Sequence, residues 1–168
     1  ANAGLVAHVS GERVGAELSR LLEAPRPSIG LRVAADTGLL AVIVPELAAQ
    51  RGIAQNKVPG EDLWDHTLRS VDAAPPSRPV VRLAALLHDV GKPATLADGR
   101  FHHHDAVGAQ QAAAILRRLR FPKDTVEDVA HLVRHFSIDT DTTKLVRADL
   151  PWRQREINFD RLFPQRTD

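Results

Sequence analysis

The feature that most constrains the fold is the apolar run VVRLAALL, which leads directly into a His-Asp pair at residues 88 and 89. This stretch is too apolar for a surface helix, so residues 80–89 are predicted to form the buried central helix of the domain. Gly91 is expected to stop that helix, and Pro93 prevents its continuation. Two side chains that bind metals well, His88 and Asp89, are therefore expected at the end of a helix that points into the protein.

The rest of the chain reads as helical nearly throughout, which predicts an all-α fold. Ser10 and Asp62 are expected to cap two of the helices, and Pro45 is expected to bend or interrupt another. A short strand near residues 100–102 is the one extended segment considered. Besides residues 80–89, the apolar periodicity and the break residues predict helices over residues 12–22, 29–35, 39–48, 63–74, 104–119 and 123–136.

Composition restricts the class of protein and the chemistry available to it. Of the 168 residues, 43% are hydrophobic and 26% charged, which is typical of a globular protein. No apolar run approaches the roughly 20 residues that span a bilayer, and no signal-peptide pattern opens the chain, so we expect a cytoplasmic protein without membrane contact. Cysteine is absent. Any transition-metal site must therefore use imidazole and carboxylate ligands, which suit Fe, Mn, Zn, Co or Mg.

Asp89 is the residue whose position most favours a cation. An acidic side chain at the C-terminal, negative end of a helix is unfavourable, and a cation nearby would relieve that cost. His66 is less informative by itself, because a histidine in the middle of a helix is more often a structural residue than a ligand.

Further histidines cluster in the second half of the chain. His104 lies where a helix is expected to begin and Asp105 is expected to cap it, which places a phosphate-compatible helix N-terminus there. His131 and His135 are four residues apart and share a helix face. For His131 we favour the polar edge of an amphipathic helix over a role as a ligand.

Taken together, these motifs resemble the HD superfamily of metal-dependent phosphohydrolases. The pattern consists of His66, then HDVGK at residues 88–92, FHHHDAVGA at 101–109 and VRHF at 133–136. It is most similar to the HD domain of bacterial tRNA nucleotidyltransferases and poly(A) polymerases. SGERVGAEL at residues 10–18 and TGLLAVIVPEL at 37–47 resemble the helical region that precedes the HD domain in that family.

The resemblance covers roughly residues 5–136 and implies an all-α HD-domain bundle with a helical lead-in. Accordingly we predict a lead-in over residues 1–50, an HD domain over 51–150 and a tail over 151–168. No Met is present and the chain opens on ANAGLV, so we expect it to be a piece of a longer protein. The nucleotidyltransferase head has no counterpart here, so this chain alone is not expected to add nucleotides.

The site residues carried over by resemblance form one metal centre and its surroundings. His66, His88 and Asp89 match the metal-binding positions, and Lys92 matches a lysine that contacts phosphate or reaches water. Asp89 and Lys92 are the predicted catalytic residues. His104 and His135 are candidates for a second metal or for phosphate.

This chain departs from the family pattern at three places. His103 stands where the family usually has Gly. Phe136 replaces the second His of the family's RHH motif, which puts a complete second metal site in doubt. The distal Asp ligand is best matched by Asp149, with Asp139 and Asp141 as rivals.

The predicted function is a divalent-metal-dependent phosphohydrolase acting on a phosphomonoester or cyclic phosphodiester of a nucleotide or RNA end. The ion is Fe, Mn, Zn, Ni, Co or Mg. The main alternative is a non-catalytic HD module that packs tRNA or a partner subunit, and a guanosine-tetraphosphate hydrolase is a third. tRNA is included among the expected partners, and a homodimer is left open.

Overall fold

A computed structural model of the chain describes residues 9–54 and 58–135, and the predicted all-α fold is confirmed over this part of the chain. A two-stranded antiparallel hairpin of β1 (Leu96–Ala97) and β2 (Arg100–Phe101) is the one sheet among these residues. The helices are α1 (Gly11–Glu23), α2 (Pro27–Asp36), α3 (Leu39–Ile43), α4 (Pro45–Ala48), α5 (Leu63–Ala73), α6 (Pro79–Leu87), α7 (Lys92–Thr95), α8 (His104–Arg118) and α9 (Lys123–His135).

Local sequence signals set several of these helix ends as predicted. The hydroxyl of Ser10 accepts a hydrogen bond from the Arg13 amide, and the Asp62 carboxylate accepts one from the Asp65 amide at 2.8 Å. Both bonds satisfy amide groups that have no partner inside the helix. Pro45 begins α4 directly after Val44, so the expected helix over residues 39–48 is split into α3 and α4.

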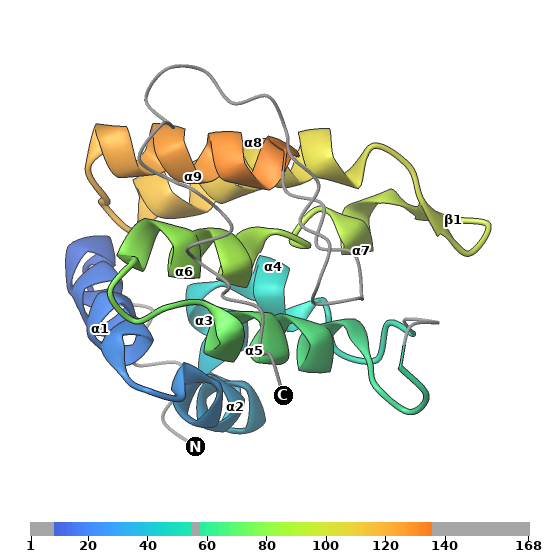
Figure 1. The fold of residues 1–168 in the computed structure, drawn as a ribbon, viewed down its shortest axis with the longest axis horizontal. Helices are drawn as coiled ribbons and strands as arrows, with labels where there is room; N and C mark the ends of the chain where they lie inside the picture. The colour runs from blue at the N-terminus through green and yellow to red at the C-terminus, as the bar shows by residue number, and fades with distance from the viewer. Residues whose placement is uncertain (1–8, 55–57, 136–168) are drawn as a thin grey trace, which may run out of the picture.

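The helices stack in layers around α6 (Figure 1). The antiparallel pair α8 and α9 lies on one side of α6, and α5 lies on the other, with α2 packed against the far side of α5. Every residue of α6 from Val81 to Leu87 is buried. The apolar run therefore forms the central helix, as its composition predicts.

The role of Gly91 differs from the one predicted. Its backbone is right-handed, with φ of −78°, so it does not end α6 as a left-handed cap. A Cβ at this position would lie 2.3 Å from the His104 carbonyl oxygen and 2.5 Å from the Gly108 amide nitrogen. Gly91 is thus required because α8 passes too close for any side chain. α6 itself ends at Leu87.

Asp105 and the loop before α8 also differ from expectation. His103 occupies the N-cap position of α8, and no side chain caps this helix. Asp105 lies in the first turn and forms an ion pair with Arg134 at 3.9 Å. The segment expected to be a plain loop holds α7 and the β1–β2 hairpin, which includes the short strand anticipated near residue 100.

A buried arginine joins the helical lead-in to the bundle. Arg82 on α6 is 1% exposed and donates hydrogen bonds to the carbonyl oxygens of Leu22 and Ala24, at the end of α1, and of Ala74, at the end of α5. Helix C-termini leave carbonyl groups without partners. One guanidinium satisfies such groups at two helix ends.

None of the helices in the described part of the chain has the length and apolar character that crossing a membrane requires.

Candidate metal centre

Three predicted metal ligands meet in the interior of the protein. His66 lies in the middle of α5, whereas His88 and Asp89 lie in the turn that follows α6. Their side chains are almost fully buried, with 4%, 3% and 3% exposure. Nε2 of His66 lies 3.1 Å from Nε2 of His88 and 3.6 Å from Oδ2 of Asp89, and His88 Nε2 lies 3.1 Å from the same oxygen.

These separations suit one shared divalent ion. Nitrogen and oxygen ligands bound to one tetrahedral ion at about 2.0–2.2 Å are separated by about 3.3 Å. The three atoms fall near that spacing, and all potential ligand atoms of the group lie within 4.8 Å of one another. In the described residues this is the one group of three or more His, Asp and Glu side chains that fits a metal ion. The donor set, two imidazoles and a carboxylate, fits Zn, Fe, Mn, Co or Ni.

The Asp89 carboxylate stays ionised in spite of its burial. Burial alone raises the pKa of this carboxyl, but the charges and hydrogen bonds of His88 and Lys92 outweigh it and hold the pKa far below its usual range. Lys92 Nζ donates to Asp89 Oδ2 at 2.7 Å. At neutral pH this carboxylate is therefore ionised, which is the form that binds a metal.

Lys92 is itself held in place by two contacts. Its side chain is 7% exposed, and besides the bond to Asp89 its ammonium lies 5.3 Å from the centre of the Phe101 ring. Ammonium groups are attracted to aromatic faces at this range. The short helix α7 and strand β2 thus fix the predicted phosphate-binding lysine beside the metal centre.

The second ring nitrogens of the two histidines have different partners. Nδ1 of His88 lies 2.8 Å from the Ala85 carbonyl oxygen, one turn back along α6. Nδ1 of His66 lies 3.4 Å from Nη2 of Arg69, whose Nη1 is held by Glu61 Oε2 at 2.6 Å. Neither Arg69 nor Glu61 was among the predicted site residues, although Arg69 follows His66 by three residues on a helix, a spacing that predicts contact between the two side chains.

His104 lies next to the centre but outside the converging group. Its Nδ1 is 3.1 Å from the Phe101 carbonyl oxygen, and its ring meets the Phe101 ring edge-on at a centroid distance of 6.5 Å. Phe101 therefore links His104 to Lys92. This role of Phe101 was not predictable, because an aromatic residue in a predicted loop carries no sign of which charged group it will contact.

His135 pairs with His131 on α9. Their ring centroids are 4.5 Å apart, which confirms that the two share a helix face. Burial of the His131 ring and the charge of His135 lower the pKa of His131, and Asp128 opposes this in part. The converging group contains neither His104 nor His135, and a second metal held by that pair stays a prediction. Asp149, Asp139, Asp141 and Phe136 lie outside the described residues.

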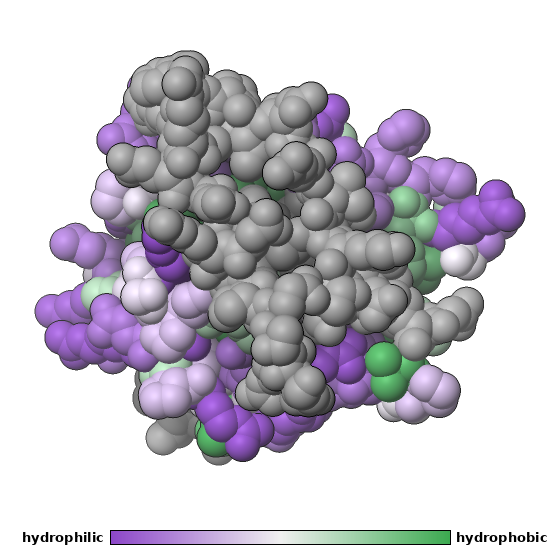
Figure 2. All heavy atoms as spheres, in the orientation of Figure 1, coloured by the Kyte–Doolittle hydropathy of each residue, from purple (hydrophilic) through white to green (hydrophobic). Residues whose placement is uncertain are grey.

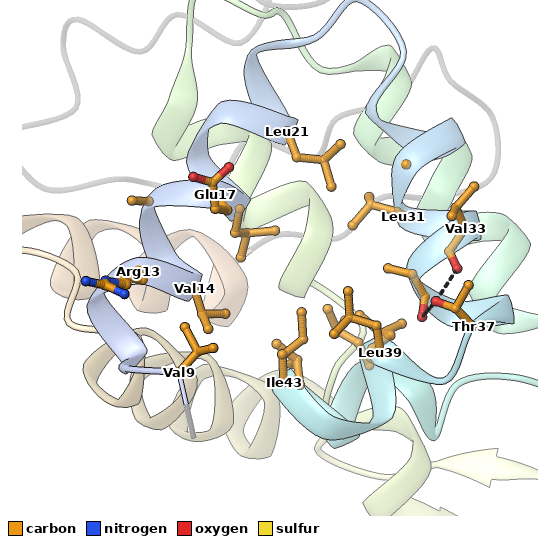
Figure 3. A pocket seen from close by; sticks show the side chains of 17 residues that line it. Val9, Arg13, Val14, Glu17, Leu21, Leu31, Val33, Thr37, Leu39 and Ile43 are labelled. Carbon is orange, nitrogen blue, oxygen red and sulfur yellow. Dashed lines mark hydrogen bonds between the residues drawn. The ribbon is translucent and has the colours of Figure 1, made fainter. Parts of the chain in front are cut away.

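An apolar hollow of about 670 Å³ lies away from the histidines, between α1, α2 and the α3–α4 segment. Leu21, Leu31, Leu39 and Val14 face into it, and Arg13 and Glu17 lie along the α1 side (Figure 3). Such a lining offers few donors for a phosphate. In the view of Figure 2, the described side chains at the rim of the molecule are mostly hydrophilic, with a few small hydrophobic areas among them.

Two family comparisons divide the chain into overlapping parts. Residues 31–162 match the HD domain family, and residues 1–51 match a family described as the probable RNA- and SrmB-binding site of polymerase A. The HD match begins inside α2, so it overlaps the helical lead-in.

The chain is also similar to individual proteins named as tRNA nucleotidyltransferases or as multifunctional CCA proteins. The chain is 48% identical over 133 residues to the CC-adding tRNA nucleotidyltransferase of Thermus thermophilus, covering 73% of this chain and 31% of that protein. It is 34% identical to the A-adding tRNA nucleotidyltransferase of Deinococcus radiodurans, covering 95% of this chain and 39% of that protein. It is 41% identical to the multifunctional CCA protein of Ralstonia nicotianae, covering 88% of this chain and 37% of that protein. The aligned part of the chain therefore spans between 31% and 39% of the length of these relatives.

Proposed function

The chain belongs to the HD domain family, its first 51 residues match the probable RNA- and SrmB-binding site of polymerase A, and from this we propose that it is a metal-dependent phosphohydrolase. The observation that carries the proposal is the buried convergence of His66, His88 and Asp89 on one point. A nucleotide or RNA end carrying a phosphomonoester or a cyclic phosphodiester is the proposed substrate class.

In this proposal His66 Nε2, His88 Nε2 and Asp89 Oδ2 hold a divalent ion, with Asp149 as the proposed fourth ligand. Such an ion lowers the pKa of water and polarises a phosphoryl oxygen. Asp89 is also proposed as the proton acceptor through its second oxygen, since one carboxylate carries two acceptor atoms. Burial keeps the carboxylate in a dry environment where its charge acts strongly.

The phosphate is assigned to Lys92 and His104. The Lys92 ammonium adjoins Asp89 and would offset the negative charge that develops on a phosphoryl group in the transition state. Because Lys92 is nearly buried, we expect the substrate to reach it from the Phe101 and His104 side.

Replacing Asp89 with Asn tests the metal centre directly. We expect the purified wild-type protein to carry close to one ion per chain, and Asp89→Asn to lose it, because the amide brings no charge to the site. Metal content by inductively coupled plasma mass spectrometry is the measurement, on protein prepared without chelator or nickel resin. Asp36→Asn, at an exposed residue paired with Arg51, is the matched control and should keep its ion. Equal metal content in Asp89→Asn and wild type would contradict the assignment.

A non-catalytic module that packs tRNA is the second candidate, favoured by the match of residues 1–51 to an RNA-binding family. This module and the enzyme differ in what they do with RNA and phosphate esters, and both could hold a metal ion. Binding of a tRNA acceptor stem that weakens steeply with salt, together with no hydrolysis of phosphate esters by the metal-loaded protein, would favour this module. Hydrolysis of a nucleoside 2′,3′-cyclic phosphate that Asp89→Asn lacks would favour the enzyme.

A further inference from the structure

The apolar hollow between α1, α2 and the α3–α4 segment gathers most of the exposed large hydrophobic side chains in the described part of the chain. Three of the five lie there: Val9 and Val33 line the hollow, and Ile29 lies one turn before Val33 on α2. Ile29 and Val33 are 59% and 58% exposed. A contiguous exposed apolar surface marks a contact with another molecule, whereas isolated exposed side chains need no such explanation.

The two opposite edges of the hollow differ in shape. Arg13 and Val14 of α1 lie at one edge, and Val33 and Thr37 of α2 lie at the other (Figure 3). The α2 edge carries Ile29 and Val33, the two most exposed of the large hydrophobic side chains described. The surface therefore combines an apolar depression with a prominent apolar edge beside it, and such an edge can enter the depression of a second copy.

Charged side chains distinguish the same two edges. Asp36 follows Val33 by three residues on α2, which places it beside Val33 on the helix surface. Its Oδ1 accepts from Arg51 at 2.8 Å, so a second cation would bind Oδ2. At the α1 edge, the Arg13 guanidinium forms no ion pair with any residue that the structure describes, whereas Glu17 is paired with Arg20 at 3.1 Å. One edge thus offers an oxygen and the other a guanidinium.

A two-fold axis through the middle of the hollow would bring these edges together twice. In such a contact both copies use the same surface, so the α2 edge of each faces the α1 edge of the other. We propose that the hollow is the interface of a homodimer of this chain. Ile29 and Val33 of one copy enter the hollow of the second copy, and Asp36 of one copy pairs with Arg13 of the other.

The extent of the surface favours a protein over a small molecule as the occupant. Seventeen residues line the hollow, and together with the α2 edge this approaches the 20–30 residues that each side of a standard interface contains. Ile29 is not among the lining residues, so a small molecule inside the hollow would leave it in water. The proposal goes beyond the proposed function and does not depend on the metal centre.

Sedimentation velocity of the full chain over a range of micromolar concentrations is the first test. We expect a monomer–dimer equilibrium in the wild-type protein. Val33→Asp should weaken dimerisation at least about tenfold, because it places a charge without a partner inside the interface. Leu96→Asp is the matched control, since it makes the same kind of change at an apolar residue that is 47% exposed on β1. It should dimerise like wild type, and circular dichroism checks that both variants are folded.

An exchange of charges between the two edges tests the arrangement within the dimer. Arg13→Asp and Asp36→Arg should each weaken dimerisation about tenfold, since like charges would then face each other. The double variant should regain most of the wild-type affinity. Because Arg13 and Asp36 lie on opposite edges of the hollow, that recovery has to come from a contact between two copies. Asp89→Asn should dimerise like wild type, which separates this proposal from the metal centre.

The outcomes decide the proposal as follows. A wild-type chain that stays monomeric at the highest concentration overturns it, and a different protein would then be the occupant to test. A dimer that Val33→Asp leaves unchanged, or that Leu96→Asp weakens equally, also overturns it. Weakening by Val33→Asp without recovery in the double variant overturns the two-fold pairing of Arg13 with Asp36. Weakening by Val33→Asp alone, together with recovery in the double variant, supports it.

Discussion

The backbone of His103 adopts a conformation that suits the Gly of the family pattern better than the His of this chain. His103 has φ of 56° and ψ of 28°, in the left-handed region, and occupies the N-cap position of α8. A side chain costs about 1–2 kcal/mol in this conformation, whereas glycine adopts it readily. The Gly that the family usually has at this position is therefore explained by backbone geometry. The exposed imidazole of His103 does not belong to the converging metal group.

Replacing His103 with Gly should stabilise the protein. Relief of the left-handed strain outweighs the greater freedom that glycine has in the unfolded chain, and we expect a gain on the order of 0.5–1 kcal/mol in the free energy of unfolding. Urea denaturation followed by circular dichroism measures it. His102→Gly is the control, since His102 is also exposed and has no positive φ. His102→Gly should lower the free energy of unfolding by about as much as His103→Gly raises it. A higher free energy of unfolding in both variants would contradict the explanation.

At the scale of elements, the metal centre depends on how closely α8 approaches the turn after α6. Gly91 and Gly108 face each other there, with 3.3 Å between the Gly91 nitrogen and the position of a Cβ on Gly108. The turn carries Asp89 and Lys92 on either side of Gly91. Any outward shift of α8 or of the turn would therefore move two residues of the site at once.

Gly91→Ala should disrupt this packing more than Gly108→Ala does. A methyl added at residue 91 would sit 2.3 Å from the His104 carbonyl oxygen. One added at residue 108 would lie 3.3 Å from its nearest neighbour, the Gly91 nitrogen. We expect Gly91→Ala to lose about 1–3 kcal/mol of stability and to bind metal more weakly, and Gly108→Ala to show smaller effects on both. Thermal unfolding and metal titration measure them. The reverse order would contradict the conclusion that Gly91 is the tighter of the two positions.

At the scale of the whole molecule, the segment predicted as the lead-in, residues 1–50, shares one core with the helices that follow it. Apolar residues from both, among them Leu22, Leu31, Leu68 and Leu86, belong to a single buried cluster. Polar bonds also cross between them, since Thr67, next to His66, donates to the buried Gln50 at 2.8 Å. We therefore expect the two parts to unfold in one transition.

Arg82→Met tests this coupling. The substitution keeps apolar volume but leaves the carbonyl groups of Leu22, Ala24 and Ala74 without their donor, and we expect a loss of about 3 kcal/mol or more. The matched control is Arg78→Met, at an exposed residue one turn earlier, which should change stability by less than about 0.5 kcal/mol. Two separate unfolding transitions in the wild-type protein would contradict a shared core.

The sequence determined the elements and the identity of the central site. Apolar periodicity, Ser10 and Asp62 caps and the Pro45 break predicted the helices, because these signals act within a few residues of one another. The His-Asp pair at the end of the most apolar segment had to be buried with it, and resemblance to the HD family added His66.

Only the tertiary structure decided what surrounds that site. The contacts of Lys92 with Phe101 and of Arg69 with the His66 ring depend on the distances between side chains, which residue spacing does not fix. The close approach of α8 likewise changed Gly91 from a predicted helix stop into a packing residue. Contacts between elements follow from the packing of the entire core. For that reason the candidate ligands His66, His88 and Asp89 were predictable, whereas the side chains packed around them were not.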